Sequence, residues 1–288
     1  MKISLLILIS AIALSAQDFT EIRVEKVSGG YQFLEGPVWS KEGGYLLFSD
    51  VPASKVLKID SDGIKTFRTP SGKTNGNTID SQGRVLSCES EGRRVVRQDR
   101  KGNWEVLADK WEGKRLNAPN DIIVRKDGHI YFTDPAFGNQ ADTRELDFYG
   151  VYHIPPKGPM ELVAKPKGRP NGLAFSPKGN LLYVANTDDR NIVAYDVDKS
   201  GKTSNERVLI TNIDGPPDGI RVDEKGNLWI TCRGVAVYTA EGKFLHMIEM
   251  PETPANCAFG EGDMETLYVT ARTSLYRIRV GVKGSVQH

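Results

Sequence analysis

The fold is most clearly encoded in the stretch from Asn171 to Ala185. A short apolar run, Asn171-Gly172-Leu173-Ala174-Phe175, is followed by the turn residues Pro177-Lys178-Gly179 and by a second apolar run, Leu182 to Ala185. A glycine-containing turn between two short apolar runs is typical of a β-hairpin. This stretch therefore predicts two antiparallel strands, the first of which begins at an amide side chain.

The same pattern occurs six times along the chain. Each segment begins with a carboxylate or amide side chain, and the six first residues, called the axial residues below, are Glu35, Asn75, Asn120, Asn171, Asp218 and Asn256. A third strand is predicted after every hairpin, and a fourth after the first five. Radially repeated units of four short strands, about 40–45 residues long, form the blades of a β-propeller. The sequence thus predicts an all-β fold, a six-bladed β-propeller.

The sixth unit lacks a fourth strand before the chain ends. A strand-like run from Thr20 to Val27 precedes the first unit and belongs to no hairpin. We expect this run to supply the outer strand of the last blade, so that an N-terminal strand closes the ring.

Composition and charge exclude several classes of protein. Lys and Arg number 38 against 37 Asp and Glu, a net charge of +1, whereas a nucleic-acid-binding protein usually has a basic excess. The hydrophobic and charged shares, 39% and 26%, are those of a globular protein. Only three cysteines are present, too few for a disulfide scaffold, and we interpret Cys88, Cys232 and Cys257 as buried thiols.

The first residues have the pattern of a secretory signal. Met1-Lys2 provides a positive start, the apolar run Ile3 to Leu14 follows, and small residues come next. A buried N-terminal helix is the alternative, but the run has no polar face. Cleavage near Ala16 divides the chain into a signal peptide, residues 1–16, and a catalytic propeller domain, residues 17–288. We expect an exported protein, secreted or periplasmic, with no membrane anchor.

The axial residues are candidate ligands for a metal ion. The first strand of each propeller blade lies next to the axis, so the six side chains should converge at one end of the channel. The alternative interpretation is a set of turns, because Asn-Gly is a favoured turn dipeptide. A turn would explain Asn75-Gly76 well, but it explains neither Glu35 nor the register that all six residues share. Carboxylate and amide oxygens suit Ca²⁺, whereas Mg²⁺ retains more water and Zn²⁺ prefers His or Cys.

Six short motifs, spread along the chain, carry a family resemblance. They are Glu-Gly-Pro-Val-Trp at 35–39, Arg-Leu-Asn-Ala-Pro-Asn-Asp at 115–121, Tyr-Phe-Thr-Asp-Pro at 131–135, Arg-Pro-Asn-Gly-Leu at 169–173, Pro-Asp-Gly-Ile at 217–220 and Asn-Cys-Ala-Phe-Gly at 256–260. In this order they resemble the senescence-marker-protein-30/gluconolactonase/luciferin-regenerating-enzyme-like family of six-bladed propellers. The resemblance covers essentially the whole chain after the signal segment.

The resemblance implies a metal-dependent hydrolase that opens a sugar lactone. It implies one divalent cation, often Ca²⁺, with Mg²⁺ or Zn²⁺ as alternatives, held by Glu35, Asn120, Asn171 and Asp218. In the family the aspartate, here Asp218, is thought to be both ligand and general base. The implied partner is a small-molecule lactone, and nothing indicates a nucleic acid.

One motif departs from the family pattern. Many relatives have Cys-Glu-His before an arginine pair, whereas this chain has Cys88-Glu89-Ser90-Glu91. The departure leaves the second-blade wall of the pocket, and with it the substrate, undetermined.

Substrate contacts are expected on the same face as the axial residues. Loop position and the ends of the second strands single out Arg115, Asn117, Asp134, Arg233 and Arg272. For Arg233 and Arg272, an ion pair on the propeller rim is an equally good interpretation. The longest blade carries an insertion, Pro135 to Gly150, which we expect to lie over this face as a partial lid.

Two other functions are compatible with this sequence. A related ester or phosphotriester hydrolase would use the same metal site. A non-catalytic ligand- or protein-binding propeller would use the same fold, because fold alone does not specify function. An oxygen-lined axial site favours an enzyme, because a binding scaffold has no need for such a cluster.

Overall fold

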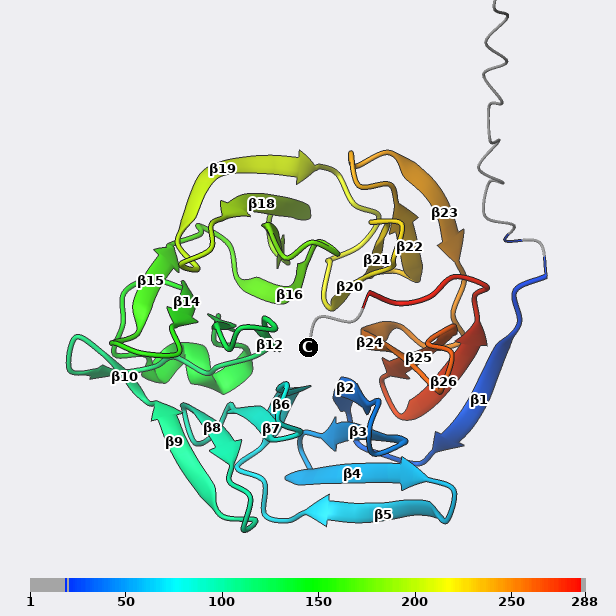
Figure 1. The fold of residues 1–288 in the computed structure, drawn as a ribbon, viewed down its shortest axis with the longest axis horizontal. Helices are drawn as coiled ribbons and strands as arrows, with labels where there is room; N and C mark the ends of the chain where they lie inside the picture. The colour runs from blue at the N-terminus through cyan, green and yellow to red at the C-terminus, as the bar shows by residue number, and fades with distance from the viewer. Residues whose placement is uncertain (1–18, 20, 286–288) are drawn as a thin grey trace, which may run out of the picture.

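A computed structural model describes Phe19 and residues 21–285 of the chain (Figure 1). The predicted signal peptide, residues 1–16, lies outside the described residues, as does His288. In the described part, no helix has the length and apolar character needed to cross a membrane.

Six four-stranded antiparallel sheets surround a central axis (Figure 1), so the predicted six-bladed β-propeller is confirmed. From the axis outward, blades 1 to 3 consist of β2 (Leu34–Ser40), β3 (Tyr45–Asp50), β4 (Lys55–Asp60) and β5 (Gly63–Arg68); β6 (Thr74–Ile79), β7 (Val85–Glu89), β8 (Arg94–Gln98) and β9 (Trp104–Ala108); and β12 (Ile122–Val124), β13 (Ile130–Asp134), β14 (Gly150–Ile154) and β15 (Glu161–Ala164). Blades 4 to 6 consist of β16 (Pro170–Phe175), β17 (Leu181–Asn186), β18 (Asn191–Val197) and β19 (Thr203–Ile210); β20 (Ile220–Val222), β21 (Leu228–Thr231), β22 (Val235–Tyr238) and β23 (Phe244–Ile248); and β24 (Pro254–Gly260), β25 (Thr266–Ala271), β26 (Ser274–Arg279) and β1 (Val24–Gly29).

The ring is closed by the N-terminal strand, as the sequence predicts. Strand β1 pairs antiparallel with β26, and Val24 lies opposite Ile278. Glu25 accepts two hydrogen bonds of 2.9 Å from the Arg277 guanidinium across this pair. Because β1 and β26 come from opposite ends of the chain, their ladder fastens the last blade to the beginning of the first.

The core lies between neighbouring blades. Aromatic rings bridge the gaps: Trp39 of blade 1 stacks on Tyr268 of blade 6, with ring centroids 6.0 Å apart. Trp229 of blade 5 meets Phe259 of blade 6 edge to face at 5.6 Å. Such pairs stabilise by roughly 0.5–1.5 kcal/mol beyond the burial of their area. All three cysteines are free and buried here, which confirms their predicted state.

Hydrogen bonds join each blade to the next at the axis. The backbone carbonyls of four axial residues, Asn75, Asn120, Asn171 and Asp218, each accept a bond of 2.7–2.9 Å from the preceding blade. The donors are Ser49 Oγ, Gly76 N–H, Thr133 Oγ1 and Gly172 N–H. The remaining joints use Gly219 N–H with the Ala255 carbonyl and Leu34 N–H with the Arg272 carbonyl.

Glycine follows several axial residues because the backbones of adjacent blades nearly touch. A Cβ atom at Gly172 would lie 2.2 Å from the carbonyl oxygen of Asp218. One at Gly36, whose φ is +49°, would lie 2.0 Å from that of Asn75. These dipeptides are therefore not turns. The glycine permits close contact between inner strands.

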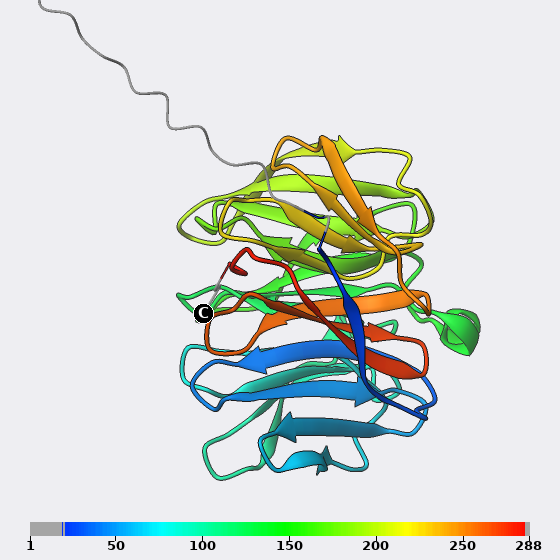
Figure 2. The ribbon, with the colours of Figure 1, turned by 90° about the vertical axis from the view of Figure 1, so that its right-hand side faces the viewer.

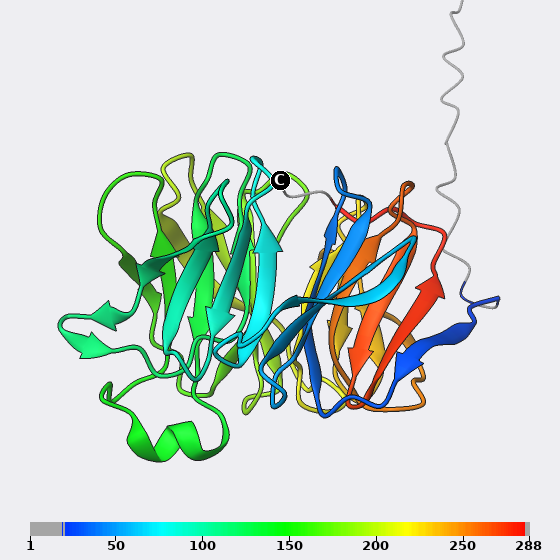
Figure 3. The ribbon, with the colours of Figure 1, turned by 90° about the horizontal axis from the view of Figure 1, so that it is seen from below.

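The two faces of the disc differ. The segment between β13 and β14 contains the 3₁₀ helix η1 (Gly138–Thr143), which projects from one face (Figures 2 and 3). The last described residues lie on the other face, where Ser285 N–H bonds to the Val222 carbonyl. A two-stranded hairpin, β10 (Lys110–Trp111) and β11 (Lys114–Arg115), leads into the third blade.

Replacing Gly172 with Ala is expected to destabilise the ring. The added methyl group would force blades 4 and 5 apart, at a cost of about 1–3 kcal/mol. Thermal or urea unfolding of Gly172→Ala should show this loss. Gly262→Ala is the matched control, because a Cβ there meets no atom within 4 Å. Equal stability of the two variants would contradict the close approach at the axis.

Candidate metal centre and active site

A cavity of about 470 Å³ opens at the axis on the face that carries η1. Five of the six axial residues line it, namely Glu35, Asn75, Asn120, Asn171 and Asp218. They come from five blades, and all four of the predicted metal ligands are among them. The convergence expected from the sequence register is therefore present in the structure.

The inner strands are irregular where they present these side chains. Strand pairing shifts register between Glu35 and Val38 in β2, and between Pro170 and Leu173 in β16. In blades 3 and 5 the regular ladder begins only after Asn120 and Asp218. Bulges of this kind redirect a side chain and are common next to active sites. Here they turn the axial side chains from the sheet toward the channel.

Four side-chain oxygens at this cavity are buried and have no hydrogen-bond donor. They are the Oδ1 atoms of Asn75, Asn120, Asn171 and Asp218. A buried acceptor without a partner costs roughly 1–3 kcal/mol, so four such atoms in one place indicate a missing positive group. Hard cations such as Ca²⁺ bind carboxylate and amide oxygens in this way. The residues present thus fit a divalent cation.

The donor set consists of oxygens rather than nitrogen or sulfur. In the described part of the chain, no three His, Cys, Asp or Glu side chains gather as a metal-binding group. His129 and His153 are buried in blade 3, with 2.7 Å between Nδ1 and Nε2, and neither lines the cavity. A cation held here would depend on amide oxygens, a donor set that does not suit Zn²⁺.

The environment of the cavity disfavours the ionised forms of its two carboxyl groups. Burial raises the pKa of Glu35 to about 8, and repulsion from Asp121 adds to the shift. Burial also raises the pKa of Asp218 well above its ordinary value, followed by repulsion from Glu35. A positive ion between the two carboxylates would offset much of the free-energy cost of ionising them.

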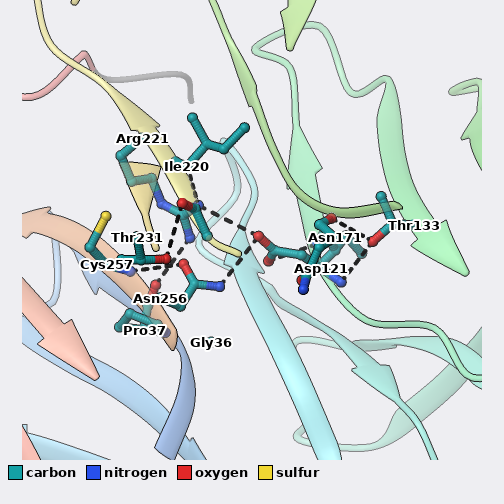
Figure 4. A network of polar contacts seen from close by, with 12 residues as sticks. Gly36, Pro37, Asp121, Thr133, Asn171, Ile220, Arg221, Thr231, Asn256 and Cys257 are labelled. Atoms are coloured by element: carbon teal, nitrogen blue, oxygen red, sulfur yellow. Dashed lines mark hydrogen bonds and ion pairs between the residues drawn. The ribbon is translucent and has the colours of Figure 1, made fainter. Parts of the chain in front are cut away.

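The sixth axial residue does not reach the cavity. Asn256 is fully buried, and its Oδ1 accepts the backbone N–H of Cys257 at 2.9 Å. Its Nδ2 donates to Asp121 Oδ2 at 3.4 Å (Figure 4). The Asn256 side chain also hydrogen-bonds Glu35. Asn256 therefore lies next to the other axial residues without lining the cavity.

The five predicted substrate contacts do not line the cavity, and the reasons differ. Asp134 is fully buried, and its two oxygens accept the backbone N–H groups of Asn117 and Ala118 at 2.7 Å. Asn117 is equally buried and donates to the Asp134 and Phe148 carbonyls. These two residues support the loop before Asn120.

The three predicted arginine contacts lie away from the cavity. Arg233 forms ion pairs of 2.7 Å with Asp214 and Glu249, in agreement with the alternative of an ion pair on the propeller rim. The Arg115 backbone N–H donates to Glu145 at 2.7 Å, which ties β11 to the segment after η1. Arg272 is exposed and does not line the cavity.

Other side chains, not predicted from the sequence, form the cavity wall. Lys73, a lining residue, has a left-handed φ of +51°, and its Nζ pairs with Glu91 at 2.9 Å. Ser90, at the departure from the family motif, also lines the cavity. Phe137 and Gln140 line it from the expected lid. Nothing in the sequence predicts the left-handed backbone that places Lys73 in the wall. The departure from the family motif at Ser90, by contrast, pointed to this part of the wall.

Comparison with known proteins agrees with this geometry. The family model described as SMP-30/gluconolactonase/LRE-like region matches residues 33–273. The chain belongs to this family. A gluconolactonase of Zymomonas mobilis is 34% identical, covering 91% of this chain and 82% of that protein.

Two further similar proteins extend the comparison. The pentonolactonase XacC of Haloferax volcanii is 27% identical, covering 82% of this chain and 80% of its own. The solved structure of a gluconolactonase from Xanthomonas campestris superposes with a TM-score of 0.85 at 35% identity, covering 93% and 92% of the two chains. The sequence resemblance to the SMP-30/gluconolactonase family is thereby confirmed.

Metal-free protein is expected to lose stability as the pH rises. The folded-state pKa of Glu35, about 8, exceeds its ordinary value of 4.5, so its contribution is complete below pH 4.5 and is lost up to about pH 8. One such proton gives a slope of at most about 1.4 kcal/mol per pH unit. Unfolding in EDTA across this range measures the slope.

Glu35→Gln should remove much of this pH dependence and stabilise the metal-free protein at pH 8. Glu42→Gln, at an exposed position, is the control. A Glu35→Gln protein with an unchanged slope would show that Glu35 is not held in its protonated form.

Proposed function

We propose that this protein is a metal-dependent lactonase that opens sugar lactones. The observation that carries the proposal is the set of four unpartnered buried oxygens, together with Glu35, around one cavity. Its membership of a family that includes a gluconolactonase and a pentonolactonase supports the substrate class. A cavity of about 470 Å³ is also within the size range of small-molecule sites.

The cation is proposed to be Ca²⁺, held by Glu35, Asn120, Asn171 and Asp218, with Asn75 as an additional oxygen donor. The two carboxylates supply two negative charges, which match a divalent ion. Ca²⁺ accepts about 6–8 oxygen ligands in a flexible shell, so positions remain for water and substrate. When bound, the ion would act as a Lewis acid toward the lactone carbonyl.

Asp218 is proposed as the general base. Its Oδ1 faces the cavity without a hydrogen-bond donor, while Asn171 donates to its carboxyl group. Asp218 would take a proton from water as the water oxygen bonds to the lactone carbonyl carbon. The ring C–O bond then breaks, and the proton is returned to the departing alkoxide to give the hydroxy acid. General base catalysis contributes about 10²–10⁴-fold in rate.

The cavity wall is proposed to orient the sugar ring. Lys73 is the cationic side chain among the lining residues, and its pair with Glu91 is largely exposed and therefore weak. Lys73 can turn from Glu91 to a substrate hydroxyl at little cost. Gln140 on η1 offers an amide from the neighbouring blade, and Phe137, close to it in the sequence, can limit access of water.

Chelation should abolish lactone hydrolysis, and Ca²⁺ should restore it. Acid release from a panel of aldonolactones, followed in EDTA and after addition of Ca²⁺, Mg²⁺ or Zn²⁺, measures this. At saturating Ca²⁺, Asp218→Asn should reduce kcat by about 10²–10⁴-fold, because the amide retains an oxygen ligand but cannot accept the proton. If no lactone is hydrolysed with any ion, the protein is a binding propeller or acts on another ester. A normal rate in Asp218→Asn would remove Asp218 as the base.

Lys73→Met is expected to impair binding more than chemistry. Loss of one charged hydrogen bond should raise KM about tenfold, with kcat changed by less than about threefold. Steady-state kinetics on the best lactone of the panel separate the two parameters. Lys178→Met, in an exposed turn between β16 and β17, is the matched control. An unchanged KM in Lys73→Met would place the sugar elsewhere in the cavity.

A further inference from the structure

A third carboxylate lies beneath the cavity, at the centre of the network in Figure 4. Asp121 follows the axial residue Asn120, is fully buried and does not line the cavity. Its Oδ1 accepts the Ile122 N–H at 2.9 Å, and its Oδ2 accepts the Asn256 amide at 3.4 Å. These donors favour the ionised carboxylate, whereas burial raises the pKa of Asp121 above its ordinary value.

Arg221 of β20 approaches the same carboxylate from below. Its Nη1 lies 3.7 Å from Asp121 Oδ2. The guanidinium also donates to the Ile220 carbonyl at 2.6 Å and to the Pro37 carbonyl at 3.3 Å. On its other side Arg221 lines a second cavity, of about 80 Å³, toward the opposite face of the disc. The side chain is thus held at the axis, outside the proposed metal centre.

Four ionisable side chains near the axis set the net charge around the proposed cation site. Around a bound cation, which would favour the ionised forms, Glu35, Asp218 and Asp121 would supply three negative charges. Arg221 supplies one positive charge, which would leave two negative charges. The carboxylate of Asp121 acts on both Glu35 and Asp218, and Arg221 acts on Glu35. Because all three carboxylates lie in a low-dielectric interior, this balance is only weakly screened.

We propose that Asp121 and Arg221 are positioning residues that set the affinity and charge preference of the axial cation site. Without touching the ion, Asp121 strengthens its binding, and Arg221 limits the site to a net charge that a divalent ion neutralises. The inference rests on the proposed cation site. It assigns functions to two residues beyond the four predicted ligands.

Opposite changes in affinity distinguish this role from a structural one. Asp121→Asn keeps the size of the side chain but removes a negative charge, so the Kd for Ca²⁺ should rise about tenfold or more. Arg221→Met removes the positive charge, so the Kd should fall by about tenfold. The double variant should return to within about threefold of the wild type. A purely structural role predicts weaker binding in every variant.

Isothermal titration of the metal-free proteins with Ca²⁺, at mildly alkaline pH, measures these affinities without any substrate. Competition with Tb³⁺ adds a second readout, because a trivalent ion gains more from an added negative charge. The preference for Tb³⁺ over Ca²⁺ should increase in Arg221→Met and decrease in Asp121→Asn. Arg221→Lys, which keeps the charge and alters the hydrogen bonds, should bind Ca²⁺ like the wild type.

A buried aspartate at the other end of β20 provides the matched control. Asp223 is fully buried and accepts the Trp229 indole N–H at 3.1 Å, so Asp223→Asn should alter stability but not Ca²⁺ affinity. If Asp121→Asn fails to fold, Arg221→Met against Arg221→Lys still tests the charge.

The outcomes separate the two proposals. A wild-type protein that binds no ion overturns the cation site and this inference together. Wild-type binding with unchanged Kd in Asp121→Asn, or weaker binding in Arg221→Met, overturns only the inference.

Discussion

The structure depends on the close approach of six inner strands around one axis. At four of the six joints between blades, the carbonyl of an axial residue accepts a hydrogen bond from the preceding blade. Where a glycine follows the axial residue, as at Gly172, there is no space for a larger residue. The same contacts that join the blades therefore also fix the positions of the axial side chains, and stability and site geometry have one origin.

The close approach of the inner strands gathers side-chain oxygen atoms in a buried place, where acceptors without donors destabilise the fold. The Oδ1 atoms of three asparagines and of Asp218 are buried without donors, and burial opposes the charges of Glu35 and Asp218. A ring built only for stability would carry apolar side chains at these positions, since an unpartnered buried acceptor is destabilising. The cost is offset if a cation occupies the cavity, because the ion then replaces the missing donors. The contacts between blades hold these oxygens in place without an ion.

Blade number, strand order and ring closure followed from the sequence because each blade repeats a local pattern. The alternation of apolar runs and glycine-containing turns specifies hairpins, and the unpaired run near the N-terminus had only one sheet edge to join. The outer contacts were harder to predict. Asp134 and Arg233 stand at the correct strand ends, but Asp134 binds backbone N–H groups and Arg233 binds Asp214 and Glu249. Whether a polar side chain at a strand end faces a cavity or a neighbour depends on groups that are distant in the sequence.

The sequence by itself determined the six blades, the closing strand and the oxygen-bearing residues at the start of each inner strand. These features depend on short-range spacing, which a single chain displays directly. Only the tertiary structure decided that Asn256 does not line the cavity, that Lys73 and Gln140 enter its wall, and that Asp121 and Arg221 meet beneath it. Each of these depends on contacts between different blades, and such contacts exist only after the ring has closed.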